Sequence, residues 1–280
     1  MSQIAITNWD DAYSNGGYIE DAGSFPSNWS RDAEDYRKLL ISQNRFLADI
    51  SYGSGDREIL DIFLPEGTPK GLMVFVHGGY WQAFDKSSWS HFANGAVEQG
   101  WAVAMPSYTL CPYAKISEIT KQIGAAIEIA ASRIAGPVSL SGHSAGGHLV
   151  SRMMCKNSPL STGTIQRLKS VVSISGLHDL RPLLKNSMNN ILGMDMQEAT
   201  AESAALLQPL QNVSLTCWVG KLERPEFRRQ NALLANIWTG FGLSTCVVEA
   251  ANKHHFNVID DLGLPGSKLI NALTIDTSSK

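Results

Sequence analysis

Short runs of apolar residues alternate with amphipathic segments through most of the chain from Gly71 onward. A continuous apolar run of four or five residues is typical of a strand buried on both faces of a sheet. An apolar residue at every third or fourth position is typical of a helix with one buried face. The alternation of the two predicts an α/β fold, with a mostly parallel central sheet and helices on both faces. The predicted strands are Leu72–Val76, Trp101–Met105, Val138–Leu140, Val171–Ile174, Leu215–Val219 and Thr245–Val248, and the predicted helices are Ser90–Gln99, Ile116–Ile134 and the segment near Glu226–Ile237.

The segment that precedes this alternation predicts an N-terminal arm and helix in residues 1–47. Residues 1–30 are polar, yet aromatic residues are interspersed among them, which favours an arm packed on the body of the protein over a free tail. A helix is expected to begin at a cap near Ser30 and to end near Gln43. Its inward-facing side chains are predicted to be Tyr36, Leu39 and Leu40.

Two other segments complete the predicted outline. Ala48–Tyr52 and Ile59–Leu64 lie on either side of a glycine-rich turn, which predicts a hairpin. Residues 177–211 have the composition of loop and helix and are expected near the pocket. Since no repeat, low-complexity tract or linker interrupts the chain, residues 1–280 are predicted to form a single domain.

The composition narrows the range of partners and compartments. The net charge of −3 argues against nucleic acid or an anionic membrane as a partner. The four cysteines are widely spaced, without a CxxC pair, so neither a disulfide scaffold nor a zinc site is expected, and no cofactor is predicted. The sequence shows no signal peptide and no long apolar span, which favours a soluble cytoplasmic protein. The partner expected from the candidate chemistry described below is a small-molecule substrate. The oligomeric state is left open, with a homodimer as one alternative.

A five-residue pattern, Gly142-x-Ser144-x-Gly146, follows one predicted strand and precedes an apolar pattern typical of a helix. A sharp turn from strand to helix needs small residues on both sides, because helix and strand approach closely there. Ser144 at the apex is predicted to present an exposed hydroxyl and to act as a nucleophile. The backbone N–H of Ala145, at the helix N-terminus, is a candidate donor to an oxyanion. The alternative is a glycine-rich turn with an incidental serine.

Paired glycines follow the predicted strand Leu72–Val76, in the stretch His77-Gly78-Gly79-Tyr80-Trp81. Open α/β sheets place their sites at strand ends of this kind. Glycines there let the backbone approach a ligand closely, so the N–H groups of Gly79 and Tyr80 are further candidates for the oxyanion hole. The alternative interpretation is a simple tight turn.

Two glutamates follow the predicted strand Leu215–Val219, downstream of the candidate nucleophile. A carboxylate at this place would hold a catalytic histidine in the required tautomer. Glu223, just beyond the strand, is the preferred candidate for this carboxylate. Glu226 is better explained as a residue of the first turn of a helix, stabilised by the helix dipole. The alternative is that both glutamates are surface charges.

Two adjacent histidines follow the last predicted strand, and either could act as general base and then general acid. His255 is preferred over His254 because it lies beside Phe256, which is expected to begin the apolar side of a closing helix with Ile259 and Leu262. The histidines that flank the serine turn, at positions 143 and 148, are expected to make structural hydrogen bonds. No pair of histidines has the spacing of a metal site.

The motifs in combination resemble a known family. His77–Trp81, Gly142–His148, Ser175–Leu180 and His255-Phe256 together look like the α/β-hydrolase arylformamidases, which include the serine kynurenine formamidases and their bacterial esterase-like relatives. The resemblance covers roughly residues 48–262. It implies the α/β-hydrolase fold. Many members have an aspartate where this chain has Glu223, and a glutamate can fill the same role.

By this resemblance, Ser144 is the nucleophile, Glu223 the acid and His255 the base. The implied reaction is the hydrolysis of N-formylkynurenine to kynurenine and formate, without a metal. Trp81 and His178 are expected from their loop positions to contact a flat substrate. The alternatives are a short-chain carboxylesterase and, from another class, a non-catalytic scaffold that binds a small ligand.

Overall fold

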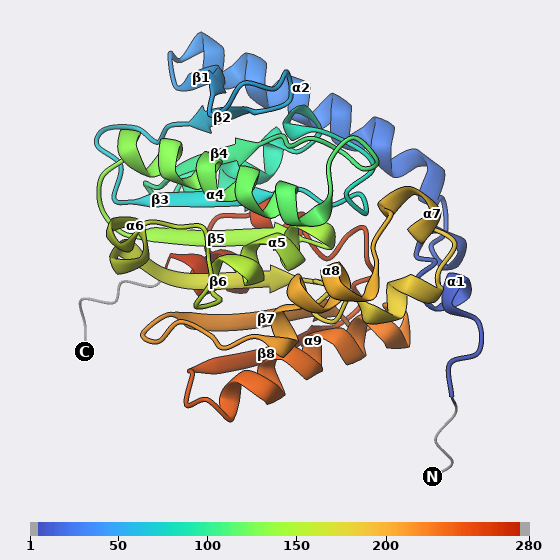
Figure 1. Cartoon of the computed structure of the whole chain (residues 1–280). Helices are drawn as coiled ribbons and strands as arrows, with labels where there is room; N and C mark the ends of the chain where they lie inside the picture. Colours follow the sequence, from blue (N-terminus) through green and yellow to red (C-terminus); the bar gives the residue numbers. More distant parts are fainter. Residues whose placement is uncertain (1–4, 275–280) are drawn as a thin grey trace.

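A single twisted sheet organises the chain in the computed structural model, in which the structure of residues 5–274 is described (Figure 1). The strand order is β1-β2-β4-β3-β5-β6-β7-β8. β2 pairs antiparallel with β1 and β4, and all the other pairings are parallel. The predicted hairpin and the predicted mostly parallel sheet are therefore confirmed. The strands are β1 (Phe46–Ser51), β2 (Ile59–Phe63), β3 (Leu72–Val76), β4 (Ala102–Pro106), β5 (Val138–His143), β6 (Leu168–Ile174), β7 (Ser214–Gly220) and β8 (Thr245–Ala250).

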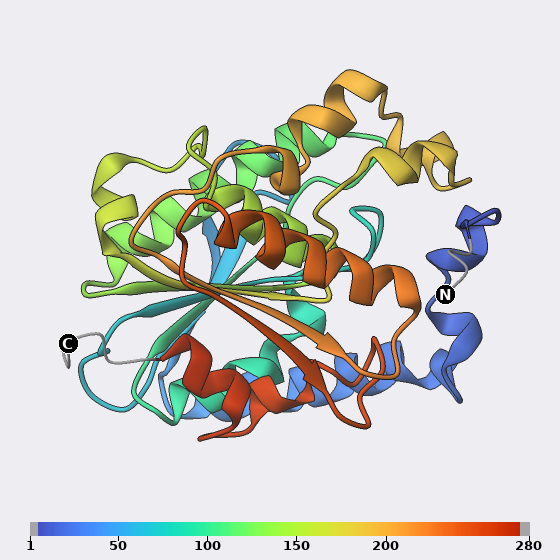
Figure 2. The same ribbon diagram turned by 90° about the horizontal axis from the view of Figure 1, so that it is seen from below.

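Helices cover both faces of this sheet, as Figure 2 shows. One face carries α4 (Ile116–Arg133), α5 (Ala145–Met153) and α9 (Pro225–Thr239), and the other carries α2 (Phe25–Ser42), α3 (Asn94–Val97) and α10 (Lys268–Leu273). Four short helices lie in the connections: α1 (Trp9–Ala12), α6 (Thr162–Arg167), α7 (Asn189–Leu192) and α8 (Met196–Ala201). No helix within residues 5–274 has both the length and the apolar character needed to cross a membrane.

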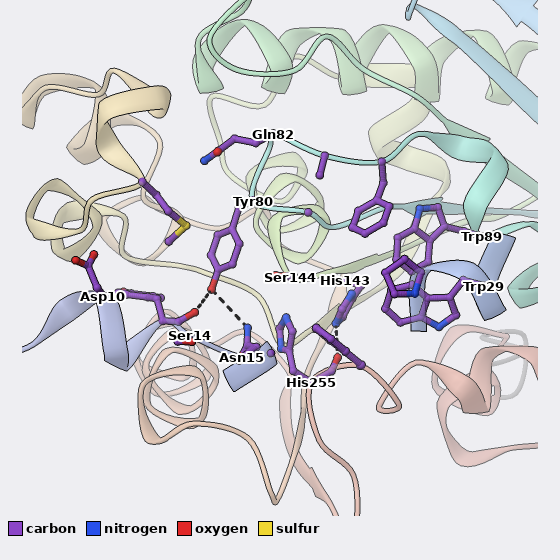
Figure 3. A pocket seen from close by; sticks show the side chains of 18 of the residues that line it. Asp10, Ser14, Asn15, Trp29, Tyr80, Gln82, Trp89, His143, Ser144 and His255 are labelled. Carbon is purple, nitrogen blue, oxygen red and sulfur yellow. Dashed lines mark hydrogen bonds between the residues drawn. The ribbon is translucent and has the colours of Figure 1, made fainter. Parts of the chain in front are cut away.

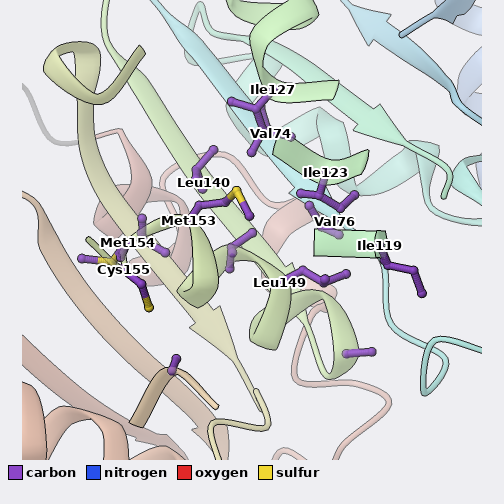
Figure 4. Packing of buried hydrophobic residues seen from close by; sticks show 14 of the residues in the cluster. Val74, Val76, Ile119, Ile123, Ile127, Leu140, Leu149, Met153, Met154 and Cys155 are labelled. Atoms are coloured by element: carbon purple, nitrogen blue, oxygen red, sulfur yellow. The ribbon is translucent and has the colours of Figure 1, made fainter. Parts of the chain in front are cut away.

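The hydrophobic core is split by the sheet into two clusters. β3 is buried along its whole length, and its alternate residues contribute to opposite clusters, as a continuous apolar run predicts. Figure 4 shows the larger cluster, in which Ile119, Ile123 and Ile127 of α4 pack beside Val74 and Val76 of β3. This packing fixes the carboxyl ends of the central strands, where the site is built.

The predicted start of the first long helix is wrong. α2 begins at Phe25 and has Pro26 in its first turn, where the fixed φ of proline favours a helix start. The aromatic residues before Ser30 suggest an arm, but Trp29 belongs to the buried stripe of the helix. Leu39, expected to face inward, lies off that stripe and is half exposed.

The predicted closing helix at residues 256–262 is also wrong. The chain makes turns there and then a short 3-10 helix at Asp260–Gly263, while the last α-helix, α10, comes later. The side chain of Asn257 accepts a hydrogen bond from the N–H of His254, which closes a local turn in place of a helix. Ile259 and Leu262 are nevertheless buried, as their apolar pattern predicted.

Candidate active site

Ser144 lies at the apex of a sharp turn between β5 and α5. Its backbone has φ 55° and ψ −115°, a conformation that non-glycine residues rarely adopt and that persists only where the surroundings hold it. A Cβ atom on Gly142 would lie 2.2 Å from the carbonyl oxygen of Gly146, and one on Gly146 would lie 1.9 Å from that of Val76. Side chains at these positions would force the strand and helix apart, so the predicted need for small residues is confirmed.

A cavity of about 520 Å³ opens above this turn (Figure 3). Ser144 lines it together with His255, although the serine is only 2% exposed, so its hydroxyl lies in the cavity and not on the open surface as expected. The other lining residues are Asp10, Tyr13, Ser14, Asn15, Gly16, Pro26, Trp29, Gly79, Tyr80, Gln82, Ala83, Phe84, Trp89, His143, Ser187, Met188 and Phe256. Aromatic side chains gather on one side of Ser144 and polar side chains of the N-terminal arm on the other.

The loop after β3 passes directly beside the serine. A Cβ atom on Gly78 would lie 3.1 Å from the Cβ of Ser144, and the next two residues, Gly79 and Tyr80, line the cavity. Ala145 is the first residue of α5 and is buried. The structure thus brings the three candidate oxyanion donors to the same end of the sheet, and their role as donors stays a prediction.

Glu223 and His255 form a short hydrogen-bonded pair. The Nδ1–H of His255 donates to Oε2 of Glu223 at 2.6 Å, and both residues are buried. The other carboxylate oxygen, Oε1, accepts from the hydroxyl of Ser175 at 2.6 Å and from the N–H of Gly220 at 2.7 Å. With Nδ1 directed at the glutamate, Nε2 is the ring nitrogen left to exchange a proton with Ser144. Figure 3 shows this ring pointing from its loop toward Ser144.

His143 holds the loop that carries His255. Its Nε2–H donates to the backbone carbonyl of His255 at 2.9 Å, and the two rings lie 4.6 Å apart. Burial holds the pKa of His143 well below its ordinary value, so this ring is neutral. The ring of Phe227 also packs against that of His255, with the two ring centroids 4.5 Å apart. The structural role expected of His143 is therefore confirmed, and so is that of His148, which bonds the carbonyl of Glu202.

The alternative acid and base have other partners. The Nδ1 of His254 accepts from the backbone N–H groups of Phe256 and Asn257, so this ring caps its own turn. Glu226 is 1% exposed, in the first turn of α9, where it accepts from the hydroxyl of Tyr13 at 2.8 Å and pairs with Arg229. The interpretation of the two glutamates as surface charges is wrong, since both are buried.

The two expected pocket residues, Trp81 and His178, do not line this cavity. Trp81 is fully buried in the core, with its ring edge-on to that of His148 at 5.3 Å. His178 is also fully buried, between the hydroxyls of Ser151 and Ser173, and burial lowers its pKa to about 3. Their expected contact with a substrate is not supported by the structure. No three His, Cys, Asp or Glu side chains among residues 5–274 come together in a way that could hold a metal ion.

Two parts of the site were missed by reasoning from the sequence. Ser175, which has φ 52° just beyond β6, bonds Glu223, and its place in the motif Ser175–Leu180 was the available signal. The arm supplies the polar wall of the cavity from residues 10–16. The aromatic residues of the arm predicted packing on the body, but no local signal predicted packing on the site.

Comparisons with known proteins agree with this architecture. Residues 60–216 match the model of the BD-FAE family. The chain is 29% identical over 261 residues to a kynurenine formamidase of Salmo salar, covering 85% of this chain and 88% of the relative. It is 28% identical to a kynurenine formamidase of Danio rerio, with the same coverage. The resemblance to arylformamidases is thereby confirmed.

Solved structures give the same fold. A crystal structure of a candidate thioesterase from Silicibacter sp. TM1040 is 53% identical, covers 95% of this chain and 98% of its own, and superimposes with a TM-score of 0.91. An arylesterase structure superimposes with a TM-score of 0.67. It is 16% identical and covers 86% of this chain and 98% of its own, so it supports the fold alone. Since the matched model spans more than half of the chain, the protein belongs to the BD-FAE family and is an α/β-hydrolase.

Proposed function

We propose that this protein hydrolyses a small aryl amide or ester through Ser144, His255 and Glu223, most specifically by the arylformamidase reaction, in which N-formylkynurenine and water give kynurenine and formate. The observation that carries the proposal is the 2.6 Å hydrogen bond between Glu223 and His255, beside a serine on a strained turn in the same cavity. The similarity to kynurenine formamidases supports the choice of substrate.

In the first half of the reaction, the hydroxyl oxygen of Ser144 attacks the substrate carbonyl carbon and Nε2 of His255 takes the hydroxyl proton. Glu223 holds the Nδ1–H tautomer, which leaves Nε2 free for that proton, and stabilises the imidazolium that forms. The backbone N–H groups of Gly79, Tyr80 and Ala145 are assigned to the oxyanion of the tetrahedral intermediate.

In the second half, His255 returns the proton to the leaving nitrogen or oxygen, and the bond from that atom to the carbonyl carbon breaks. Ser144 then carries the acyl group as an ester. Water attacks this ester while His255 takes one of the water's protons, and the acid is released as the serine recovers its proton. The aromatic wall suits the flat ring of an aryl substrate, and in it the rings of Trp29 and Trp89 lie 4.8 Å apart, tilted by 38° to each other.

A second candidate, hydrolysis of an uncharged carboxylic ester, is favoured by the charges of the cavity. Among its lining residues within 5–274 there is no lysine or arginine, and Asp10 at its polar side is a carboxylate. Asp10 can pair with the α-ammonium group of N-formylkynurenine, but the α-carboxylate of that substrate has no cationic side chain of the described walls to pair with, and desolvating an unpaired charge is costly. A neutral aryl ester avoids this penalty.

One kinetic comparison separates the two candidates. The value of kcat/KM is measured side by side on N-formylkynurenine, p-nitrophenyl acetate and p-nitrophenyl butyrate, with Ser144→Ala as the blank. A kcat/KM at least tenfold higher on the formamide than on either ester supports the arylformamidase, and the reverse order supports the carboxylesterase. Absence of Ser144-dependent turnover on all three substrates would contradict the proposed function.

A further inference from the structure

The N-terminal arm, residues 8–18, contacts three segments around the cavity: residues 186–187, Arg224 and the loop that contains Tyr80. It receives hydrogen bonds from residues 186 and 187, namely from the side chain of Asn186 to the carbonyl of Trp9 at 2.9 Å and from the N–H of Ser187 to Asp10 at 2.6 Å. Its Asp11 pairs with Arg224, just before α9. The arm itself lies outside the stretch 60–216 that matches the family model, yet its Asp10 and residues 13–16 line the cavity.

The loop that carries two of the assigned oxyanion donors has an unfavourable backbone. Gly79, Tyr80 and Trp81 follow one another with φ values of 102°, 49° and 58°. Only glycine adopts positive φ without cost, so the other two residues keep this conformation because surrounding contacts hold them. Trp81 is held by the body of the protein, since its side chain is fully buried and its carbonyl accepts from the N–H of Cys111 at 2.8 Å.

Tyr80 is held by the arm. Its hydroxyl donates to the backbone carbonyl of Tyr13 at 2.6 Å, and the side-chain amide of Asn15 donates to that hydroxyl at 3.5 Å (Figure 3). Burial raises the pKa of Tyr80, and the nearby charge of Glu223 raises it further, so the hydroxyl stays a neutral donor.

Tyr13, whose backbone carbonyl accepts this hydrogen bond, is itself held by residues of α9. The hydroxyl of Tyr13 donates to Glu226, and its ring meets Phe227 edge-on at 6.0 Å. Phe227 in turn packs against the ring of His255 at 4.5 Å. The arm therefore connects the oxyanion loop to the elements that position the base and the acid.

We propose that Tyr80 is a positioning residue, and that the hydrogen bond from its hydroxyl to the carbonyl of Tyr13 sets the orientation of the oxyanion-loop N–H groups. The arm is then part of the active site, because it supplies the carbonyl that fixes this loop. The inference rests on the proposed function. Loss of this hydrogen bond should destabilise the transition state, in which charge develops on the oxyanion, and should leave the binding of the substrate unchanged.

The test compares Tyr80→Phe with Tyr113→Phe, which also removes one tyrosine hydroxyl but at an exposed residue outside the arm that does not line the cavity. Two rates are measured: kcat on p-nitrophenyl acetate, and the second-order rate of phosphorylation by diethyl p-nitrophenyl phosphate. In the latter reaction the Ser144 oxygen bonds to phosphorus, p-nitrophenolate leaves and His255 takes the serine proton. The phosphoryl oxygen then lies where the oxyanion would form.

For Tyr80→Phe we expect both rates to fall about tenfold, the scale of one lost hydrogen bond, while KM stays within about twofold. The melting temperature should change by less than about 4 °C. Tyr113→Phe should leave both rates within about twofold of the wild type. If Tyr80→Phe does not fold, Asn15→Ala weakens the same contact from the arm side and should lower kcat by about threefold without raising KM.

The inference is overturned if the folded Tyr80→Phe protein keeps both rates within about twofold, or if its KM rises while kcat is unchanged. The same conclusion follows if Asn15→Ala, used in its place, leaves kcat unchanged. A wild-type protein that neither turns over the ester nor reacts with the phosphate triester would contradict the proposed function instead. The two failures are therefore distinguishable.

Discussion

Replacing Glu223 by glutamine tests how the site controls the proton of His255. Oε1 of Glu223 accepts from the N–H of Gly220 at 2.7 Å and from the hydroxyl of Ser175, while Oε2 accepts from Nδ1–H of His255 at 2.6 Å. A glutamine has one oxygen and one NH2 group for these two places. Because the backbone N–H of Gly220 is a fixed donor, the amide oxygen should stay beside it and the NH2 group should face His255.

That orientation reverses the histidine tautomer. Nδ1 would have to accept from the glutamine NH2 group, so the proton would move to Nε2, which could then no longer take the proton of Ser144. Loss of tautomer control in a serine triad lowers kcat by about 10⁴-fold, equivalent to about 5.5 kcal/mol of transition-state stabilisation. The opposite amide orientation would place two N–H donors against each other, at a cost of about 1–3 kcal/mol for the unsatisfied groups.

The assay is kcat on p-nitrophenyl acetate near neutral pH, with circular dichroism and thermal melting to confirm the fold. The matched control is Glu226→Gln, which removes the charge of the other buried glutamate three residues away. Glu226 bonds Tyr13 and Arg229 but not His255, so this variant should lose stability while keeping kcat within about tenfold of the wild type. A folded Glu223→Gln protein that keeps more than a tenth of the wild-type kcat would refute the reasoning.

His255→Ala should lower kcat by about a thousandfold or more. His254→Ala disturbs only a local turn and should lower kcat by about tenfold at most. The reverse order of the two effects would show that the base has been misassigned. The free energy of unfolding should fall in acid, because burial lowers the pKa of each of four histidines below its value of about 6.5 in the unfolded chain. As the pH drops, the unfolded chain therefore takes up protons that the native state excludes. Burial lowers the pKa of His77 and His148 to about 4 and that of His178 to about 3, and it holds the pKa of His143 well below its ordinary value. Each histidine should reduce the free energy of unfolding by up to about 1.4 kcal/mol per pH unit as the pH drops from about 6.5 toward 4; urea unfolding at several pH values measures this, and a constant stability over that range would contradict it.

The central strands and the serine turn could be predicted because their signals are local. An apolar run marked β3 at its observed bounds, and α4 differs from the predicted Ile116–Ile134 by one residue at its end. The glycines around Ser144 marked the turn because the close approach of strand and helix excludes side chains there. The start of α2 was missed because its first turn is rich in residues that also suit an arm.

The walls of the site depend on contacts between distant residues, which a single sequence does not reveal. Tyr13 bonds Glu226 across 213 residues, and Tyr80 bonds Tyr13 across 67. The misplacement of Trp81 has a backbone cause: positive φ values at Tyr80 and Trp81 turn the loop so that Tyr80 lines the cavity and Trp81 enters the core. Neither the φ values nor the arm contacts follow from residue type or periodicity.

The central claim is that Ser144 is the nucleophile of a hydrolase. Its most direct test is peptide mapping by mass spectrometry after treatment with diethyl p-nitrophenyl phosphate, carried out on the wild type and on Ser144→Ala. We predict one diethyl phosphoryl group per chain, on the peptide that contains Ser144, with esterase activity lost in proportion to its formation. Ser144→Ala should take up no phosphoryl group and should show almost no turnover, although it remains folded. A phosphoryl group found on another residue, or a folded Ser144→Ala protein that keeps a tenth of the wild-type activity, would contradict the account.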